Sequence, residues 1–282
     1  MSRRLLAALT ALLLLLAACG DSDDSASTDE STPTSAAEET SGSTEADAPA
    51  EPLTILVTND DGIGAPGIDS LVTTLSTLDD VELVIVAPAE NQSGSSDTTS
   101  EGAVTSAPGT TASGVEGTAV DGTPADAVTV ALDELGIEPD LVVSGVNSAQ
   151  NVGPLAAISG TVGAARTAVR RDLPAVAASA GLSEDPDFDS ASQLVLEWIT
   201  ENRDALDDGS IAVDGVVSFN IPDCTAGEIG ELVEVPLATA IPEGLNVFES
   251  DCSLVGEAGV PTDDVDGISK GFATETLVPA EL

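Results

Sequence analysis

Residues 53–67 read LTILVTNDDGIGAPG, and the fold is organised around this stretch. Leu53 to Thr58 is a continuous apolar and β-branched run, which is typical of a buried parallel strand. Asn59, Asp60 and Asp61 follow directly, then a glycine-rich turn and apolar residues at helical spacing. Adjacent carboxylates oppose each other's ionisation unless a cation or hydrogen-bond donors lie beside them. The stretch therefore predicts a strand, a charged turn that attracts a positive ion, and a helix.

The same alternation of strand and helix continues along the chain. We predict strands at residues 53–58, 81–87, 141–144, 175–179 and 216–220, and helices at residues 68–78, 124–135, 159–171 and 190–203. Beyond Pro222 the pattern weakens into short strands and loops. The expected fold class is α/β, a Rossmann-like, doubly wound and mainly parallel sheet with a smaller irregular β-containing C-terminal part.

The first part of the chain predicts export. Residues 1–19 combine basic Arg3 and Arg4 with a short apolar run and a Leu-Ala-Ala-Cys ending, which resembles a lipoprotein signal with Cys19 as the lipidated residue. An ordinary signal peptide cut near Ala18 is the alternative. Residues 20–51 are rich in Ser, Thr, Asp and Glu and predict a disordered acidic tether. Residues 52–282 then form the folded domain, anchored to the outer face of the cell membrane by the lipid.

Composition excludes several classes of function. The chain has 7 basic and 50 acidic residues and a net charge of −43, so it should repel nucleic-acid polymers and contact membranes only through its lipid. It has no histidine and no tyrosine, which excludes Ser-His-Asp catalysis and histidine-based zinc sites. Cys224 and Cys252 form an even pair in an exported protein, so a disulfide is plausible, with two free thiols as the alternative.

Polar clusters follow the ends of separate predicted strands. They occupy residues 59–61, 91–93 and 145–151. In open α/β sheets, ligands bind in the crevice at the carboxyl ends of the strands. We therefore expect these loops to converge on one site.

Residues 62–67 also match the G-x-G-x-x-G pattern of dinucleotide-binding loops. Asp60 and Asp61 would then stand beside a pyrophosphate with no counter-charge. The second strand ends in Ala87-Pro88, where a ribose-binding acid is expected. Both observations disfavour a dinucleotide.

A resemblance to one family runs through the whole domain. The chain resembles the SurE family of metal-dependent nucleotidases, in order, through TNDDGIGAPGI, APAENQSGSS, DGTPADAV, DLVVSGVNSAQNVG, SGTVGAAR, LPAVAAS, FNIPD and GFATETLVP. The match covers nearly all of residues 53–279. Because it depends on many motifs in the right order, it is specific.

The resemblance implies a set of site residues. The metal ligands fall on Asp60, Asp61, Ser93 and Asn147, with Asp60 and Asp61 also catalytic. Phosphate recognition falls on Asn151, Ser159, Gly160 and Thr161. Carboxylate, hydroxyl and amide oxygens suit a hard divalent cation such as Mg²⁺ or Mn²⁺. Turn formation and helix capping remain the structural alternatives for these residue types, and Arg166 and Arg170 are expected to form solvent-facing ion pairs.

The implied function is metal-dependent hydrolysis of a phosphomonoester, as a 5′(3′)-nucleotidase or acid-phosphatase-type enzyme acting on nucleoside monophosphates. The family also suggests a homodimer or higher homo-oligomer. Among the departures from the family, Pro154-Leu155 replaces an acidic stretch, Ile158 replaces an aromatic residue before Ser-Gly-Thr, and Gly64 replaces a histidine. The altered Pro154 loop and the scarcity of aromatic residues favour a rival function, a non-catalytic lipoprotein of the same fold that binds a phosphorylated solute.

Overall fold

The computed structural model describes residues 52–253, 255–256 and 259–282. The predicted signal peptide, the lipidation of Cys19 and the tether at residues 20–51 lie outside the described residues. Among the helices of the described ranges, none combines the length and the apolar character needed to cross a membrane.

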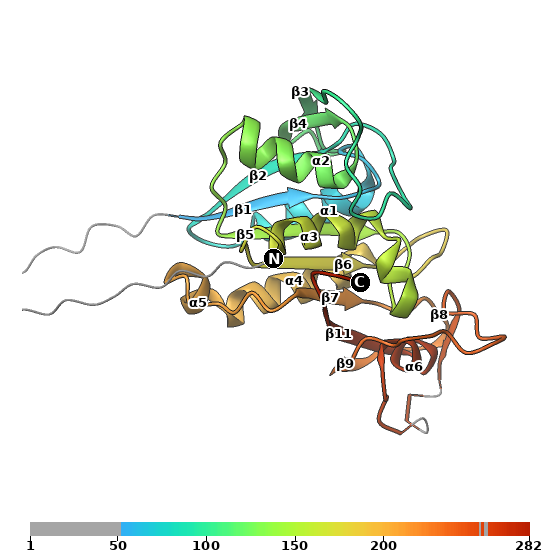
Figure 1. Cartoon of the computed structure of the whole chain (residues 1–282). Coiled ribbons are helices and arrows are strands. Elements are labelled where there is room, and N and C mark those ends of the chain that lie inside the picture. The colour runs from blue at the N-terminus through green and yellow to red at the C-terminus, as the bar shows by residue number, and fades with distance from the viewer. Residues whose placement is uncertain (1–51, 254, 257–258) are drawn as a thin grey trace, which may run out of the picture. The chain divides into compact units, whose positions relative to one another are not determined.

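A nine-stranded sheet forms the centre of the described domain (Figure 1). From β4 to β7 all neighbouring strands are parallel, β3 pairs antiparallel with β4, and β11 pairs antiparallel with β7. The predicted α/β class with a mainly parallel sheet is confirmed. In sheet order the strands are β3 (Thr105–Thr110), β4 (Glu116–Asp121), β2 (Val81–Pro88), β1 (Leu53–Thr58), β5 (Leu141–Asn147), β6 (Ala175–Ser179), β7 (Val216–Asn220), β11 (Phe272–Val278) and β9 (Gly230–Glu234).

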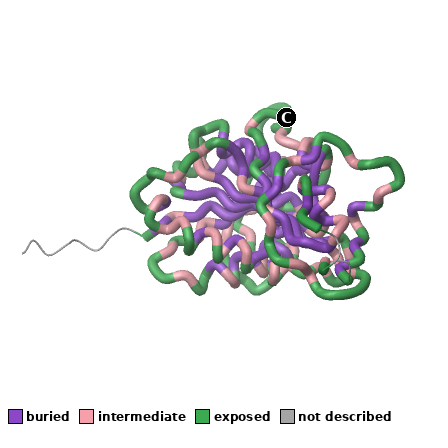
Figure 2. Tube along the Cα trace, turned by 90° about the horizontal axis from the view of Figure 1, so that it is seen from below, coloured by how far each residue is buried: buried purple, intermediate pink, exposed green. Residues whose placement is uncertain are grey.

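Helices cover both faces of this sheet. Successive side chains of a strand point to opposite faces, and β1 supplies both cores in this way. Val57 packs in one cluster with residues of α1 (Pro66–Leu75) and α4 (Phe188–Glu201). Leu56 packs in the other, with residues of α2 (Pro124–Thr129) and α3 (Gly160–Val169). Figure 2 shows the buried strands enclosed by partly exposed helices and exposed loops.

Several predicted elements differ in extent. The helix predicted at 124–135 is α2 followed by a π-helical turn, η1 (Val130–Glu134), and the helix predicted at 190–203 is α4 followed by α5 (Arg203–Asp207). β5 runs three residues further than predicted, so that Asn147 is its last residue rather than part of a loop.

The C-terminal part is less separate than expected. β11 and β9 complete the central sheet, and only β8 (Cys224–Gly227) and β10 (Ser250–Cys252) form a small sheet of their own. A disulfide joins Cys224 and Cys252, whose Cα atoms are 5.4 Å apart. A short helix, α6 (Asp264–Ser269), precedes β11 and was not predicted.

The strand order creates a crevice at one point. The chain passes from β1 to β2 on one side, and later returns to place β5 on the other side of β1. Connections that leave neighbouring strands in opposite directions separate the loops at their carboxyl ends, and ligands bind there. β1 leads into Asp60 and β5 ends at Asn147, so both predicted ligands flank this crevice.

Candidate functional site

The turn after β1 is closed by a single asparagine. Asn59 Nδ2 donates to the Gly62 carbonyl oxygen (2.9 Å), and Asn59 Oδ1 accepts from the Gly62 N–H (3.2 Å). Gly62 has φ of +103°, a left-handed conformation that favours glycine. The two aspartates between these residues are therefore held in a fixed loop.

Asp60 is buried against the start of α3. It is 2% exposed, and its Oδ1 accepts a hydrogen bond from Thr161 Oγ1 (2.6 Å). A Cβ at Gly160 would lie 2.8 Å from Asp60 Cβ, so only glycine lets the helix start approach this closely. Burial raises the pKa of Asp60 to about 6, with the hydrogen bond from Thr161 opposing and the charge of Asp61 adding to the rise.

Asp61 is held by a neighbouring loop. Asn91 Nδ2 donates to Asp61 Oδ1 (2.9 Å), and the Ser148 N–H donates to Asp61 Oδ2 (3.3 Å). Burial raises the pKa of Asp61, and these hydrogen bonds oppose the rise. Asn91 Oδ1 also accepts from the Ser93 N–H (2.9 Å). Asn91 thus links Asp61 to Ser93, a positioning role that sequence reasoning did not assign to it.

A cavity of about 210 Å³ gathers most of the predicted site residues. It contains Asp60, Ser93, Asn147, Asn151 and Ser159. Asp61 instead lines an adjacent cavity, together with Asn91, and Ser148 lines both. The remaining lining residues of the first cavity are Gly94, Ser148, Ala149, Gln150, Leu155, Ile158 and Phe248. Of these, Gln150 and Phe248 were not predicted: Gln150 lies within a quoted motif, whereas no local signal marks Phe248.

The predicted phosphate-binding residues have structural partners as well. Ser159 caps α3 by accepting from the Val162 N–H (3.1 Å), which is the capping alternative. Asn151 Nδ2 donates to Ser179 Oγ (2.8 Å), and the Asn151 N–H donates to Asn220 Oδ1 (2.7 Å). These contacts fix Asn151 against the ends of β6 and β7. Ser159, the capping residue of α3, therefore lines the cavity, whereas Gly160 and Thr161 are not among its lining residues. The dipole of a helix favours an anion at its N-terminus.

The expectation of solvent-facing arginines is wrong for Arg166. Its side chain is 4% exposed, with Nη2 3.2 Å from Asp97 Oδ2 and Nε donating to the Ala280 carbonyl oxygen (2.9 Å). Arg170 also pairs with Asp97 (2.8 Å) and is more exposed. α3 packs tightly enough to bury Arg166, and Asp97 compensates its charge. None of the described residues lining the 210 Å³ cavity is Lys or Arg.

The residues present fit a hard cation. In the described ranges, no three His, Cys, Asp or Glu side chains lie close enough to hold a metal ion. A cation at Asp60 and Asp61 would therefore need neutral ligands, which the Ser93 hydroxyl and the Asn147 amide can supply. Asn147 Nδ2 donates to the Ala149 carbonyl oxygen (2.7 Å), which leaves Oδ1 for a ligand. An all-oxygen set of this kind suits Mg²⁺ or Mn²⁺.

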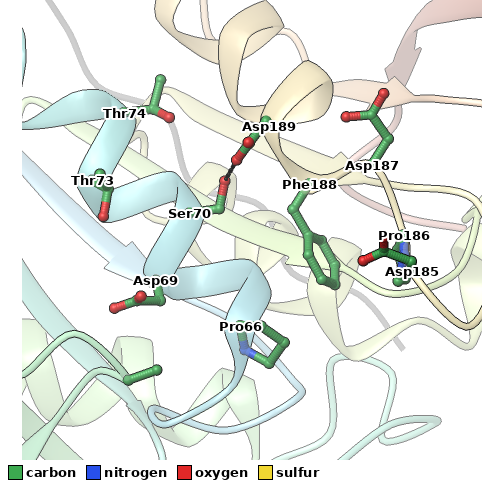
Figure 3. Close-up of a pocket in the computed structure, with 11 residues that line it drawn as sticks. Pro66, Asp69, Ser70, Thr73, Thr74, Asp185, Pro186, Asp187, Phe188 and Asp189 are labelled. Carbon is green, nitrogen blue, oxygen red and sulfur yellow. Dashed lines mark hydrogen bonds between the residues drawn. The ribbon is translucent and has the colours of Figure 1, made fainter.

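A larger cavity of about 620 Å³ lies between α1 and the start of α4 (Figure 3). Its lining includes Asp69, Asp185, Asp187 and Asp189, and Ser70 Oγ donates to Asp189 (2.7 Å). Its carboxylates would repel an anion. No buried polar atom without a partner, among the described residues, belongs to this lining. The smaller cavity is therefore the better candidate.

Comparisons with known proteins agree with the motifs. A family model described as "Survival protein SurE" matches residues 55–240. A "5′-nucleotidase SurE" of Methylococcus capsulatus is 32% identical over 239 residues, covering 81% of this chain and 92% of the relative. Its counterpart in Dehalococcoides mccartyi is 38% identical over 191 residues, with 66% and 70% covered. The crystal structure of a SurE protein from Aquifex aeolicus superposes with a TM-score of 0.64 at 25% identity, covering 81% of this chain and 94% of that one.

Proposed function

The chain belongs to the SurE family, and on that premise we propose that the 210 Å³ cavity is an active site for hydrolysis of nucleoside monophosphates. The chain is a phosphatase of the nucleotidase kind, as its relatives named 5′-nucleotidase SurE support. The observation that carries the assignment to this cavity is the contact between Asp60 and the start of α3. It puts a buried carboxylate beside a helix N-terminus, in a cavity whose described lining has no basic side chain.

The chain's own groups would bind the phosphate. The start of α3 would offer its positive dipole end to an anion beside the cavity-lining cap residue Ser159. Asn151 is held by its contacts to Ser179 and Asn220, so that its amide is already oriented for the same phosphate. Fixed donors of this kind stabilise charge that develops on phosphoryl oxygens. Thr161 also orients Asp60 through its hydroxyl.

Members of this family are metal-dependent, and Mg²⁺ or Mn²⁺ is our proposal for this chain. Asp60, Asp61, Ser93 and Asn147 would hold the ion. When bound, it supplies positive charge to the phosphoryl oxygens and lowers the pKa of a water. Without a cation, burial raises the pKa of Asp60 to about 6, so Asp60 can hold a proton on Oδ2 in mildly acidic solution while Oδ1 accepts from Thr161.

Phosphate release from a panel of nucleoside monophosphates tests the proposed function. We expect release with Mg²⁺ or Mn²⁺, none with EDTA, and a loss of at least about 100-fold in Asp60→Asn, the scale of one missing transition-state contact. Thr73→Ala, on α1 beside the larger cavity, is the matched control and should keep full activity. If phosphate compounds bind but none is hydrolysed under any metal condition, the rival function of solute capture is correct.

We further propose that the protein is an exported lipoprotein attached through Cys19. The support is the order of Arg3-Arg4, apolar run and Leu-Ala-Ala-Cys in residues 1–19. Cys19→Ser should move the protein from the membrane fraction to the soluble fraction. A variant that stays with the membrane would show that another feature attaches it.

The resemblance also supports a homodimer or higher homo-oligomer. Light scattering on the purified protein measures its mass directly. A single species with the mass of one chain at micromolar concentration would contradict this proposal.

A further inference from the structure

The candidate active site has two chemically different walls. The polar wall contains Asp60, Asn147 and Ser159. A second group of lining residues, the apolar wall, contains Leu155, Ile158 and Phe248. Ile158 is 58% exposed. A phosphate group would use only the polar wall and would leave the apolar one uncovered.

Phe248 reaches this cavity from a distant part of the chain. It lies in the segment before β10 and, like Leu155, packs against a small cluster that includes Val152, Val247 and Val265. The chain contains four Phe, one Trp and no Tyr. None of the other aromatic residues, all of which lie in the described ranges, lines this cavity. Phe219 belongs to the first core cluster, Phe188 and Trp198 on α4 pack against that cluster, and Phe272 lies on β11.

Gln150 supplies an independent sign of a ligand. Its side chain is 1% exposed and lines the same cavity. Its Oε1 accepts from the Leu182 N–H (3.2 Å), but its Nε2 has no partner among the described residues. A buried donor without an acceptor is unfavourable, so native proteins rarely leave one unless a ligand or water completes it.

The sheet order indicates which side of the cavity anchors Gln150. Leu182, which holds Gln150, follows β6, whereas Asp60 follows β1, and β5 lies between these strands. Neighbouring strands are about 4.8 Å apart, so the two strand ends are roughly 10 Å apart across the sheet. Gln150 is therefore anchored on the β6 side of the cavity, away from Asp60.

We propose that Phe248 and Gln150 form the nucleoside end of the substrate site. The Phe248 ring stacks on the base beside Ile158, and Gln150 Nε2 donates to an oxygen of the nucleoside. This inference rests on the proposed function, because the polar wall must hold the phosphate. The substrate class is accordingly a nucleoside monophosphate, and a phosphorylated sugar without a base is a poor substrate.

The test compares Phe248→Leu with Phe248→Trp. Leucine keeps an apolar side chain against the same cluster but cannot stack, whereas tryptophan can. Phosphate release from AMP and from ribose 5-phosphate is measured with Mn²⁺, and adenosine binding is measured by calorimetry on the Mn²⁺-loaded protein. We expect Phe248→Leu to weaken adenosine binding and kcat/KM for AMP about tenfold, or ~1.4 kcal/mol, mainly through KM. The kcat/KM for ribose 5-phosphate should change less than about twofold. Phe248→Trp should keep kcat/KM for AMP near the wild-type value.

Gln150 is tested by Gln150→Glu, which keeps the side-chain oxygen that Leu182 uses and removes the Nε2 donor. Adenosine binding should fall about fivefold, the usual value of one hydrogen bond. Unchanged binding in a folded variant would overturn this role. Thermal melting of every variant shows that it is folded.

The outcomes separate this inference from the proposed function. If both phosphate compounds are hydrolysed but Phe248→Leu affects them equally, or affects neither, the nucleoside site is refuted and the enzyme assignment stands. If neither is hydrolysed but adenosine binds in a Phe248-dependent way, the enzyme assignment fails and the nucleoside site stands. If wild type neither binds adenosine nor prefers AMP to ribose 5-phosphate, the inference is overturned.

Discussion

Replacing Asp60 by asparagine should stabilise the metal-free protein at neutral pH. Asp60 is 2% exposed, and burial raises its pKa from the ordinary 3.8 to about 6. The ionised carboxylate is therefore less favourable in the folded state than in the unfolded chain. Asparagine keeps an Oδ1 acceptor for Thr161 and has no charge to bury. The difference between the two pKa values corresponds to about 3 kcal/mol, an upper value for the gain.

The stability difference between wild type and Asp60→Asn depends on pH. Below pH 3.8, Asp60 is protonated in both the folded and the unfolded state, and the two proteins should be equally stable. Between pH 3.8 and about 6 the folded protein holds the proton more often, so the stability that Asp60 contributes is lost as pH rises. Above pH 6 the free energy of unfolding of the variant should exceed that of wild type by the full difference.

Urea unfolding in EDTA at several pH values measures this difference. Asp69→Asn on α1 is the matched control: partial desolvation raises the pKa of Asp69, but hydrogen bonds from Ser113 outweigh it and hold the pKa below its ordinary value. That variant should lose stability at neutral pH. With Mg²⁺ at 100 times its dissociation constant, wild type should gain about 2.7 kcal/mol and Asp60→Asn almost nothing. An Asp60→Asn variant that is less stable than wild type in EDTA at pH 7.5 would refute the reasoning.

Other perturbations have equally definite outcomes. Asn147→Ala should raise the Mg²⁺ concentration for half-maximal phosphate release by about tenfold or more, because losing one ligand worth ~1.4 kcal/mol weakens binding tenfold. An unchanged metal titration would show that Asn147 is not a ligand. Asp264 is buried and accepts hydrogen bonds from the N–H groups of Gly153 and Ala238 (2.8 Å each). Asp264→Ala should therefore lower the free energy of urea unfolding by about 2–5 kcal/mol, whereas Glu243→Ala, at an exposed position, should not. Equal unfolding midpoints for the two variants would contradict this prediction. Replacing Cys224 and Cys252 together by serine removes a bridge between residues 28 positions apart and should cost about 2–4 kcal/mol; a calorimetric melting temperature equal to that of wild type would show that the bridge adds no stability.

Local sequence was sufficient for the central strands and for the loops that follow them. The predicted bounds of β1, β6 and β7 are those of the structure, because continuous apolar runs between turn residues encode buried parallel strands. The same reasoning placed polar residues at the strand ends and expected them to meet. The structure brings Asp60, Ser93 and Asn147 into one cavity, and Asp61 into the next one. Their role as metal ligands stays a prediction.

Some elements depend on contacts that no local pattern records. The burial of Arg166 depends on Asp97 and Ala280, which lie far from it in sequence. The extension of β5 to Asn147 likewise depends on a distant segment, since Asn147 pairs with Ser179 of β6.

The sequence alone determined the α/β class, the SurE resemblance and the oxygen-rich composition of the site. The tertiary structure decided how buried Asp60 is, which polar atoms keep no partner, and which side chains complete the cavity. Phe248 is the clearest case, since it lies about 100 residues from Asn147 and yet lines the same cavity in the folded chain. Periodicity reports which face of an element is apolar, but pKa values and cavity walls depend on distances between segments that only folding brings together.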